Sequence, residues 1–399
     1  MIQTNYLYRA PLLNDKQHVL GYKLDWQKKG ENPRPSAGAD MRQLLTLGVG
    51  HAGGFKFGKF FLEAGPEALP AEILQCLSPE NTVLRLRLAD LLNKGNLPLV
   101  MSMNAQGFGL MLCDVDHALL ESNDGLLSLM THIEMDLDHP DLNEVVSFAK
   151  LAEPPLCMVV KKVRNWQEFD ACAALGLSGF FGNLCAVPRT LCPSAELNAA
   201  TVMVVQLMQM LHANADIRDL EQVLKRDATL SYKLFRYINS ASFGLEIEIE
   251  SLRHAVTMLG YMPLYRWLAL LLVTSNTAGS SPALMQAAIV RGRFVELIGQ
   301  KMLSKIHAEN LFVVGLFSLL DQLLDVSMDQ VLRQISLPAV IAQALRSRDG
   351  IYGPFLALAQ ACEDENGFVS DVAEALFITP AQVNQAHLSA LAWAQNLEV

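Results

Sequence analysis

The pattern of hydrophobic and polar positions changes near the middle of the chain. In the first half, short apolar runs are separated by longer mixed segments, and Val83–Leu88 alternates apolar with basic side chains, the period of two that is typical of a strand. Similar runs predict further strands at 19–24, 57–62, 99–103, 132–137, 156–160 and 179–181, with helices at 142–152 and 166–175. Strands alternating with helices over about 190 residues predict an α/β domain with a largely parallel sheet. The pattern fits an open sheet and a barrel equally.

The second half has a helical rhythm throughout. Proline and cysteine punctuate 187–193, and beyond this segment apolar residues recur at three- and four-residue spacing, as at Val204, Leu207 and Leu211. Residues that favour helix starts and a glycine that favours a helix end divide the region into successive helices. We therefore expect two domains, an α/β domain at 1–190 and an all-α domain at 194–399.

Composition limits the possible functions. The chain has 399 residues, of which 51% are hydrophobic and 18% charged, which predicts well-filled cores. The formal net charge is −10 and neither half is basic, so nucleic acid is a poor partner. The seven cysteines form no C-x-x-C pair and the start of the chain does not resemble a leader, which predicts a cytoplasmic protein. The strongest apolar run, residues 267–273, is too short to predict a membrane span. A phosphate-loop lookalike at 53–60 lacks the final Ser or Thr.

A motif in the second half resembles the HDOD domain of bacterial signalling proteins. The match covers roughly 200–275 and is in register with the family pattern, although Ala228 stands where the family usually has proline. Its motif positions are Asp227, Asn239, Ser240, Phe243, Gly244, Ser251 and Gly260. Asn239 and Ser240 are interpreted first as hydrogen-bonding residues near a helix end, and alternatively as part of a partner-binding surface.

The HDOD family is similar to metal-dependent HD phosphohydrolases without their metal ligands. The chain contains no His-Asp dipeptide, and Ser318-Leu319 stands near the place where such an enzyme has one. Serine is a weak metal ligand and leucine has no donor atom, so no metal is expected in this domain.

The first half resembles an EAL domain, a TIM-like barrel that hydrolyses cyclic di-GMP. The resemblance rests on Val19–Gln27, interpreted as the opening strand, and on 156–188, interpreted as the last strands. Active members hold two divalent cations with acidic residues and an asparagine at strand ends. The aligned positions here are Lys23, Glu63, Arg85, Asn104, Asp136, Lys161 and Arg164. At about 190 residues the domain is short for a complete barrel of this type.

Basic residues at positions where the family has carboxylates predict that the metal site is lost. Two unit charges 4 Å apart interact by about 4 kcal/mol at an effective dielectric of 20, so each exchange replaces an attraction of that order by a repulsion. We therefore expect a protein that is not an enzyme and has no cofactor or metal. The basic set either binds an anion or pairs with nearby carboxylates such as Glu63, Glu134 and Asp136, and the ion pairs are favoured. The basic set is Lys23, Arg85, Arg87, Lys161 and Arg164.

The function that the resemblance implies is signal transduction by a degenerate EAL–HDOD protein. The preferred hypothesis is a non-catalytic adaptor that binds other signalling proteins in cyclic di-GMP-linked control of motility or biofilm. The first alternative is a metal-free cyclic di-GMP receptor that uses a basic barrel mouth, and the second is a residual metal-dependent phosphodiesterase. The sequence does not identify the partner or the oligomeric state.

Overall fold

The computed structural model contains two compact units. Residues 1–188 and 360–395 form one, the barrel unit, and residues 189–359 with 396–399 form the other, the helical unit. The structure describes residues 5–27, 59–63, 74–75, 77–92, 96–115, 117–122, 124–153, 155–182, 184, 199–239, 249, 251–274, 281–335, 337–364, 367–395 and 397. The predicted boundary at 190–194 lies outside these residues and stays a prediction, but residues 360–395 join the barrel unit and not the helical one.

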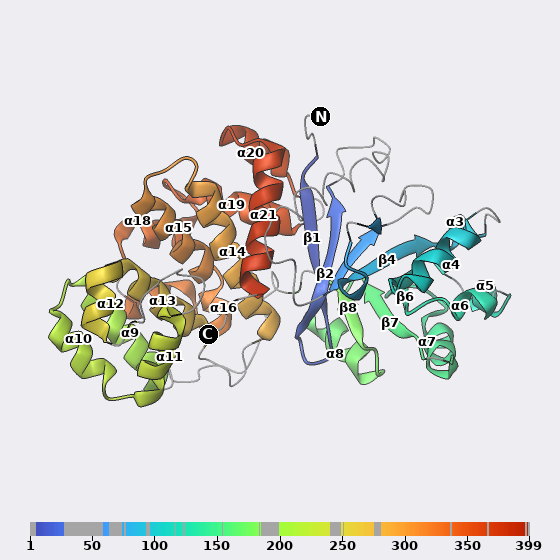
Figure 1. The fold of residues 1–399 in the computed structure, drawn as a ribbon, viewed down its shortest axis with the longest axis horizontal. Coiled ribbons are helices and arrows are strands. Elements are labelled where there is room, and N and C mark those ends of the chain that lie inside the picture. The colour runs from blue at the N-terminus through green and yellow to red at the C-terminus, as the bar shows by residue number, and fades with distance from the viewer. Residues whose placement is uncertain are drawn as a thin grey trace. The chain divides into compact units, whose positions relative to one another are not determined.

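The described strands of the barrel unit close into a barrel in sequence order (Figure 1). β1 is antiparallel to its neighbours β2 and β8, and all other neighbouring strands are parallel. The strands are β1 (Leu7–Leu13), β2 (Val19–Trp26), β3 (Lys59–Glu63), β4 (Thr82–Arg87), β5 (Gly109–Cys113), β6 (His132–Asp136), β7 (Cys157–Lys161) and β8 (Gly179–Phe181). The predicted α/β fold class is confirmed. Of the two arrangements that the sequence pattern allowed, an open sheet and a barrel, the structure has the barrel.

Short helices follow the parallel strands on the outside of the barrel (Figure 1). They are η2 (Pro79–Asn81), α3 (Leu88–Leu91), α4 (Leu97–Ala105), α5 (His117–Ser122), α6 (Asp124–Leu127), α7 (Leu142–Leu151) and α8 (Trp166–Ala174). Inward-facing apolar side chains fill the barrel, where each fully buried one contributes about 1.5–3 kcal/mol. This inner cluster comprises Leu12, Phe61, Val83, Met111, Cys113, Val159 and Phe181.

Two details of the barrel differ from the sequence prediction. The segment predicted as a strand at 99–103 is helix α4, because Pro98 stands in a first helical turn and the buried residues Val100 and Met103 are spaced by three. The strand of this region is β5, ten residues later. The segment beginning at Val19 is the second strand and not the opening one, since β1 precedes it.

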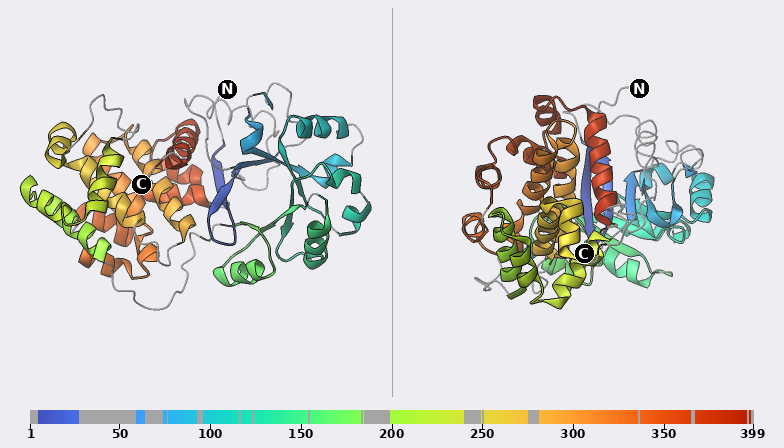
Figure 2. Two further views of the ribbon diagram at one scale, coloured as in Figure 1. Left: turned by 60° about the horizontal axis from the view of Figure 1, so that its bottom comes forward. Right: turned by 60° about the vertical axis from the view of Figure 1, so that its left-hand side comes forward.

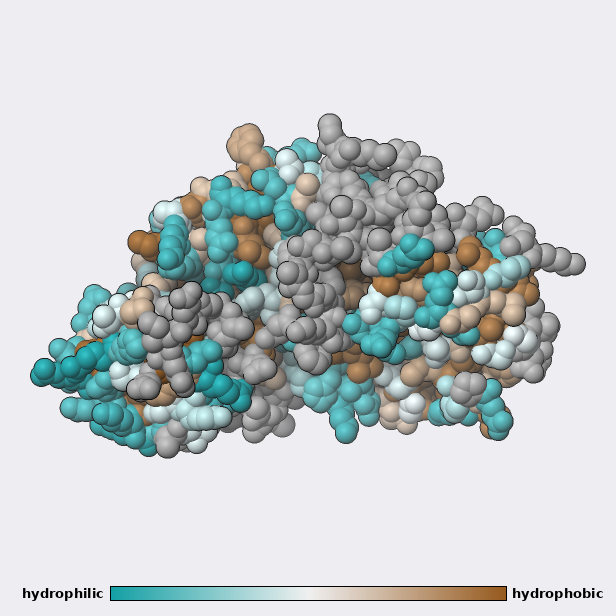
Figure 3. Space-filling view, viewed as in Figure 1, coloured by the Kyte–Doolittle hydropathy of each residue, from teal (hydrophilic) through white to brown (hydrophobic). Residues whose placement is uncertain are grey.

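The helical unit contains only helices among its described residues. They are α9 (Ala199–His212), α10 (Ile217–Leu224), α11 (Ala228–Ile238), α12 (Leu252–Leu259), α13 (Tyr261–Thr274), α14 (Pro282–Gly299), α15 (Lys305–Phe317), α16 (Leu320–Leu324), α17 (Met328–Gln334), α18 (Ala339–Ser347) and the first part of α19 (Gly353–Glu363). The amphipathic α10 buries Leu220, Val223 and Leu224, and hydrophilic side chains cover its region on the face shown in Figure 3.

Motif residues of this unit organise helix ends. The Asp227 side chain accepts from the backbone N–H of Leu230 and begins α11, and Ser251 begins α12 in the same way. Gly260 ends α12 at φ +80°, a conformation that favours glycine. The Asn239 side chain hydrogen-bonds both the N–H and the C=O of Ile249, at 2.8 and 3.0 Å. These contacts support the structural interpretation of Asn239, while Ser240, Phe243 and Gly244 lie outside the described residues.

The last segment of the chain packs on the outside of β1 within the barrel unit. It comprises the end of α19, α20 (Val369–Ala375) and α21 (Pro380–Gln395), and α21 runs beside β1 (Figure 2). The Asn384 side chain accepts from the N–H of Leu7 at 2.8 Å and donates to the carbonyl of Asn5 at 2.9 Å. The C-terminal segment therefore supplies helical cover for β1.

No single helix within the described ranges is long and apolar enough to cross a membrane. One pair of helices passes a length and composition test only when combined, Leu252–Met258 with Tyr261–Thr274, and that pair is bent by 119°.

Candidate ligand-binding site at the barrel mouth

A polar cavity of about 370 Å³ opens at the carboxyl ends of the parallel strands, the end at which barrel enzymes carry their sites. Every strand contributes to its lining, and charged groups dominate. The charged lining residues are Lys23, Asp25, Glu63, Arg85, Arg87, Asp114, Glu134, Lys161, Lys162 and Arg164. Tyr8 and Ala10 line it from β1.

A buried ion pair forms the floor of the cavity. Arg85 donates from Nε and Nη2 to the two carboxylate oxygens of Glu134, at 3.0 and 2.8 Å, and the Glu134 side chain is fully buried. Such two-point pairing is the strongest geometry available to these groups. The remaining nitrogen, Arg85 Nη1, is buried and has no hydrogen-bond partner. The floor therefore keeps one unsatisfied cationic donor.

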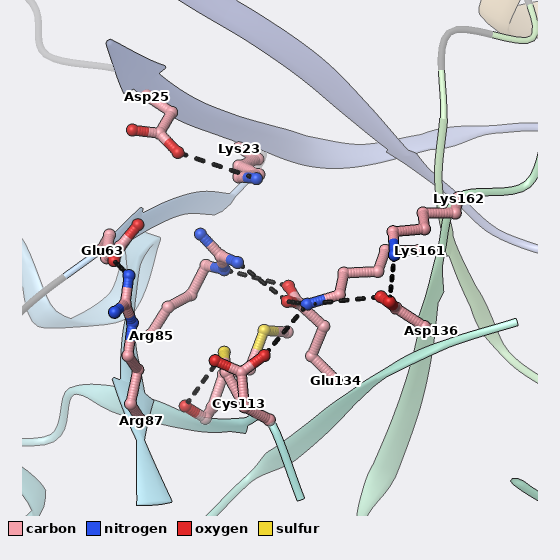
Figure 4. A network of polar contacts seen from close by, with 12 residues as sticks. Lys23, Asp25, Glu63, Arg85, Arg87, Cys113, Glu134, Asp136, Lys161 and Lys162 are labelled. Atoms are coloured by element: carbon pink, nitrogen blue, oxygen red, sulfur yellow. Dashed lines mark hydrogen bonds and ion pairs between the residues drawn. The ribbon is translucent and has the colours of Figure 1, made fainter. Parts of the chain in front are cut away.

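Lys161 joins this pair to the carboxylates of neighbouring strands (Figure 4). Its Nζ lies 3.2 Å from Glu134 Oε1, 3.4 Å from Asp136 Oδ1 and 3.3 Å from Asp114 Oδ1. The Lys161 side chain is 26% exposed, so its ammonium remains reachable from the cavity.

Further ion pairs surround the rim. Arg87 donates to Glu63 at 2.5 Å, Lys23 lies 3.7 Å from Asp25, and Lys162 pairs with Asp136. Arg164 is bonded to Asp138 at 2.5 Å, with both side chains more than half exposed. The predicted pairing of basic residues with nearby carboxylates is therefore present, and the Arg164–Asp138 pair is open to water and easily exchanged.

Two residues of the mouth adopt unusual backbone conformations. Asp114 has φ 56° and Lys162 has φ 65°, each directly after a barrel strand. A residue other than glycine in this left-handed region costs about 1–3 kcal/mol, and such strain is commonly found at functional sites. The turns direct both side chains to the mouth.

The charge states follow from this geometry. Burial raises the pKa of the Glu134 carboxyl, but Arg85 and Lys161 outweigh burial and hold it at about 2. Burial disfavours charged Lys161 and Arg85, yet the adjacent carboxylates raise the pKa of both above its ordinary value. Burial also raises the pKa of the Cys113 thiol to about 12. At neutral pH the floor thus holds two cations, one carboxylate and a protonated thiol.

The structure brings together most, but not all, of the positions selected from the sequence. Lys23, Glu63, Arg85, Arg87, Lys161 and Arg164 line the cavity, and Asp136 contacts Lys161. Asn104 does not, since it lies on α4 and donates to the carbonyl of Leu129 at 2.9 Å.

The lining residues that the sequence did not indicate include Tyr8, Asp25, Asp114 and Lys162. A signal existed for Asp114, because an apolar run, Leu110–Cys113, comes directly before it. The strand prediction was placed at 99–103 instead, which is a helix, so the strand before Asp114 was missed.

The mouth does not fit the two divalent cations that an EAL resemblance implies. Among the residues that the structure describes, no group of three or more His, Cys, Asp or Glu side chains is arranged to hold a metal. Both oxygens of Glu134 already bind Arg85, and the ammonium of Lys161 stands between the remaining carboxylates. In the helical unit, Ser318 bonds to the Gly315 carbonyl and to Arg291.

A family model, "HDOD domain", matches residues 197–336. The predicted HDOD domain is confirmed by this match, and the order of a barrel followed by an HDOD domain supports the EAL–HDOD architecture inferred from the sequence.

Two curated proteins are similar to nearly the whole chain. One is the cyclic di-GMP phosphodiesterase CdgJ of Vibrio cholerae, 25% identical over 99% of this chain and 93% of the relative. The other is the uncharacterized protein YuxH of Bacillus subtilis, 22% identical over 98% of each.

Solved structures similar to the chain include EAL domains. That of Mycobacterium smegmatis DcpA has 14% identity and a TM-score of 0.37, covering 45% of this chain and 90% of the other. The Xanthomonas citri FimX EAL domain, in complex with cyclic di-GMP, has 15% identity and a TM-score of 0.34, covering 49% of this chain and 91% of the other.

The comparison with the Vibrio protein overturns the prediction that the chain is not an enzyme, because a relative aligned over 99% of the chain is named a phosphodiesterase. That prediction rested on the metal-binding carboxylates that basic residues replace at individual strand ends. It did not include the carboxylates of Asp25 and Asp114, which also line the cavity.

Proposed function

We propose that this chain works in cyclic di-GMP signalling and that its barrel mouth binds the dinucleotide through a phosphate group. The observation that carries the proposal is the buried donor Arg85 Nη1, which has no partner although the rest of the guanidinium is held firmly by Glu134. A buried polar group without a partner costs about 1–3 kcal/mol, and a phosphate oxygen placed there recovers that cost.

The surroundings suit a phosphodiester. Each phosphate of a cyclic dinucleotide carries one negative charge, and Lys23 and Lys161 lie on the cavity wall beside Arg85. The rim cations Lys162 and Arg164 are more than half exposed in their pairs, so they can exchange a carboxylate for a phosphate at little cost. The name of the Vibrio relative supports cyclic di-GMP as the ligand.

A second candidate is hydrolysis of cyclic di-GMP. The observation in its favour is the alignment of a named phosphodiesterase over almost the entire chain, together with the carboxylates of Asp25, Glu63 and Asp114 in the cavity.

A third element of the proposal is regulation through other signalling proteins, with the HDOD region as the recognition surface. Exposed apolar side chains there, Tyr232 at 65% and Met258 at 52%, are suited to a protein partner.

Calorimetric titration of the full chain with cyclic di-GMP, with magnesium and with a chelator, tests binding at the mouth. We expect saturable heat with one site, and no comparable heat with GMP. The absence of heat in both conditions would contradict the proposal. The same samples analysed by chromatography test hydrolysis, since a linear dinucleotide or GMP appears only if the phosphodiester is cleaved.

Recovery of partners by the full chain, compared with a Tyr232→Ser, Met258→Ser variant, tests the protein-binding role. We expect the variant to lose partners that the wild type retains. Equal recovery by the two proteins would count against the HDOD surface. The full chain is required because residues 360–395 pack with the barrel.

A further inference from the structure

The ammonium of Lys161 has the surroundings of a bound cation. Three carboxylates from two neighbouring strands approach it, Asp114 after β5 and Glu134 and Asp136 on β6, with Nζ–O distances of 3.2–3.4 Å. An ammonium group has three N–H donors, so it can serve one carboxylate with each. The number of carboxylates matches the number of donors, and the contact with Asp114 is a hydrogen bond, while those with Glu134 and Asp136 are ion pairs.

The distances distinguish this arrangement from a metal site. Oxygen ligands of Mg²⁺ lie at about 2.0–2.1 Å and those of Ca²⁺ at about 2.3–2.6 Å. The three oxygens around Lys161 Nζ stand about 1 Å further out, which is the ordinary distance of an ion pair. A divalent ion at the same point requires the ammonium to leave and the carboxylates to close in.

Arg85 removes the strongest remaining ligand. Both carboxylate oxygens of Glu134 accept from its guanidinium, and the Glu134 side chain has no exposed surface. Breaking a buried pair of this kind by taking one partner away costs about 3–5 kcal/mol. A metal that competes for Glu134 has to overcome this cost in addition to repulsion by two cations.

The third nitrogen of Arg85 is the group that this arrangement leaves for a ligand. In Figure 4 one Arg85 nitrogen carries no contact and points to the side of the network where Lys23 is drawn. Arg85 and Lys161 already neutralise the carboxylates of Glu134, Asp136 and Asp114. An anion that enters the cavity can therefore contact Arg85 and Lys23 directly, with no divalent ion between them.

We propose that the Lys161 ammonium is a built-in substitute for a divalent cation, and that the barrel mouth therefore binds a phosphodiester directly, without metal. The identity of the ligand rests on the proposed function. The place of Lys161 among Asp114, Glu134 and Asp136 does not depend on the proposed function. The role of Lys161 and the identity of the ligand are therefore tested in separate experiments.

The first experiment titrates Mn²⁺ alone into the full chain and follows free Mn²⁺ by electron paramagnetic resonance. Wild type is compared with Lys161→Met, which keeps an unbranched side chain, one atom shorter, and removes its charge. Lys150→Met is the matched control, because Lys150 is exposed on α7 and donates to the Leu175 carbonyl, away from the cavity lining.

We expect no Mn²⁺ site tighter than millimolar in the wild type and the control, and at least tenfold tighter binding in Lys161→Met. Tight binding by the wild type overturns the proposal, and so does a Lys161→Met protein that binds Mn²⁺ no better than the control. If Lys161→Met does not fold, as judged by circular dichroism, Lys161→Gln is used with the same criterion.

The second experiment measures the Kd for cyclic di-GMP in a chelator and in 5 mM Mg²⁺. We expect the two values to agree within twofold, whereas a tenfold weaker affinity in the chelator overturns the metal-free mode. If the wild type binds no cyclic di-GMP in either condition, the proposed function fails, while the Mn²⁺ titration still decides the role of Lys161.

Discussion

Arg85 and Arg9 are both buried arginines of the barrel unit, and each pairs with a buried carboxylate, but their surroundings differ. Arg85 points into the mouth, where Glu134 takes two of its nitrogens and Nη1 has no partner. Arg9 lies under the C-terminal segment, where Nη2 donates to Glu363 at 2.8 Å and Nη1 meets His387 Nε2 at 2.6 Å.

The difference separates a structural polar network from one that is open to a ligand. The Arg9 guanidinium bonds to Glu363 and His387, and this network joins β1 to residues more than 350 positions away in the chain. A network that keeps a buried donor without an acceptor carries a cost that folding alone does not relieve. Arg85 lines the cavity, so a ligand that enters can relieve this cost, whereas Arg9 and His387 do not line it.

The largest effect is expected when the Arg9 network loses its cation. Arg9→Met leaves the Glu363 carboxylate buried without that positive charge, and the free energy of unfolding should fall by about 3–5 kcal/mol. Urea denaturation followed by circular dichroism measures the change. Arg346→Met is the matched control, because its pair with Asp329 is more than half exposed and contributes at most about 1 kcal/mol. A loss no larger than that of the control would mean that the Arg9 network does not hold the C-terminal segment.

Acid should weaken the barrel unit through two buried histidines. Burial, with a contribution from Lys59, lowers the pKa of His132 to about 4, and burial and Arg9 lower that of His387 well below its ordinary value. The unfolded chain takes up these protons near pH 6.5 and the folded chain does not, so stability is complete above pH 6.5 and decreases below it. Each histidine contributes a slope of about 1.4 kcal/mol per pH unit.

Urea midpoints measured from pH 7 to pH 5 test this expectation. His387→Gln should remove about half of the slope, whereas His212→Gln, at an exposed position, should leave it unchanged. Stability that is constant over this range would show that folding does not lower the pKa of either histidine.

Conservative changes of the two arginines should separate binding from stability. Arg85→Lys keeps the charge but loses the two-point contact and Nη1, and we expect about tenfold weaker binding of cyclic di-GMP, equivalent to about 1.4 kcal/mol. Arg9→Lys should leave the Kd within twofold, since Arg9 lies on the other face of β1. Calorimetric titration of both variants gives the comparison, and equal effects on Kd would remove the distinction between the two networks.

The smallest effect is expected at the rim. Arg164→Ala breaks a pair whose side chains are 62% and 61% exposed, so the free energy of unfolding should change by less than about 1 kcal/mol. If Arg164 helps to attract the ligand, the Kd rises two- to fivefold at low salt, and the difference disappears at 0.5 M salt because screening removes it. A salt-independent loss of affinity would indicate a direct contact instead.

Local sequence signals predicted a large part of the fold. The alternation at Val83–Leu88 located β4, and Asp227 and Ser251 located the starts of α11 and α12, because period and capping depend on residues a few positions apart. The HDOD motif is such a signal over a longer span. Basic residues at strand ends likewise indicated the charged mouth, since parallel strands end at one edge.

Other parts were decided only by the tertiary structure. β1 was missed because all seven of its residues are buried, so it has no alternation, and Arg9 and Pro11 are unusual in a strand. Helix α4 was mistaken for a strand because a short apolar run fits either period.

The charged side chains of the sequence determined that the mouth of this barrel is rich in ions of both signs. Which ions pair was decided by closure of the barrel, since Arg85, Glu134 and Lys161 lie on three strands separated by 49 and 27 residues. The tertiary structure also decided that residues 360–395 pack with β1 as part of the barrel unit. Pairing and closure depend on contacts distant in sequence, and no local pattern of residue types records which of several possible partners a buried charge will meet.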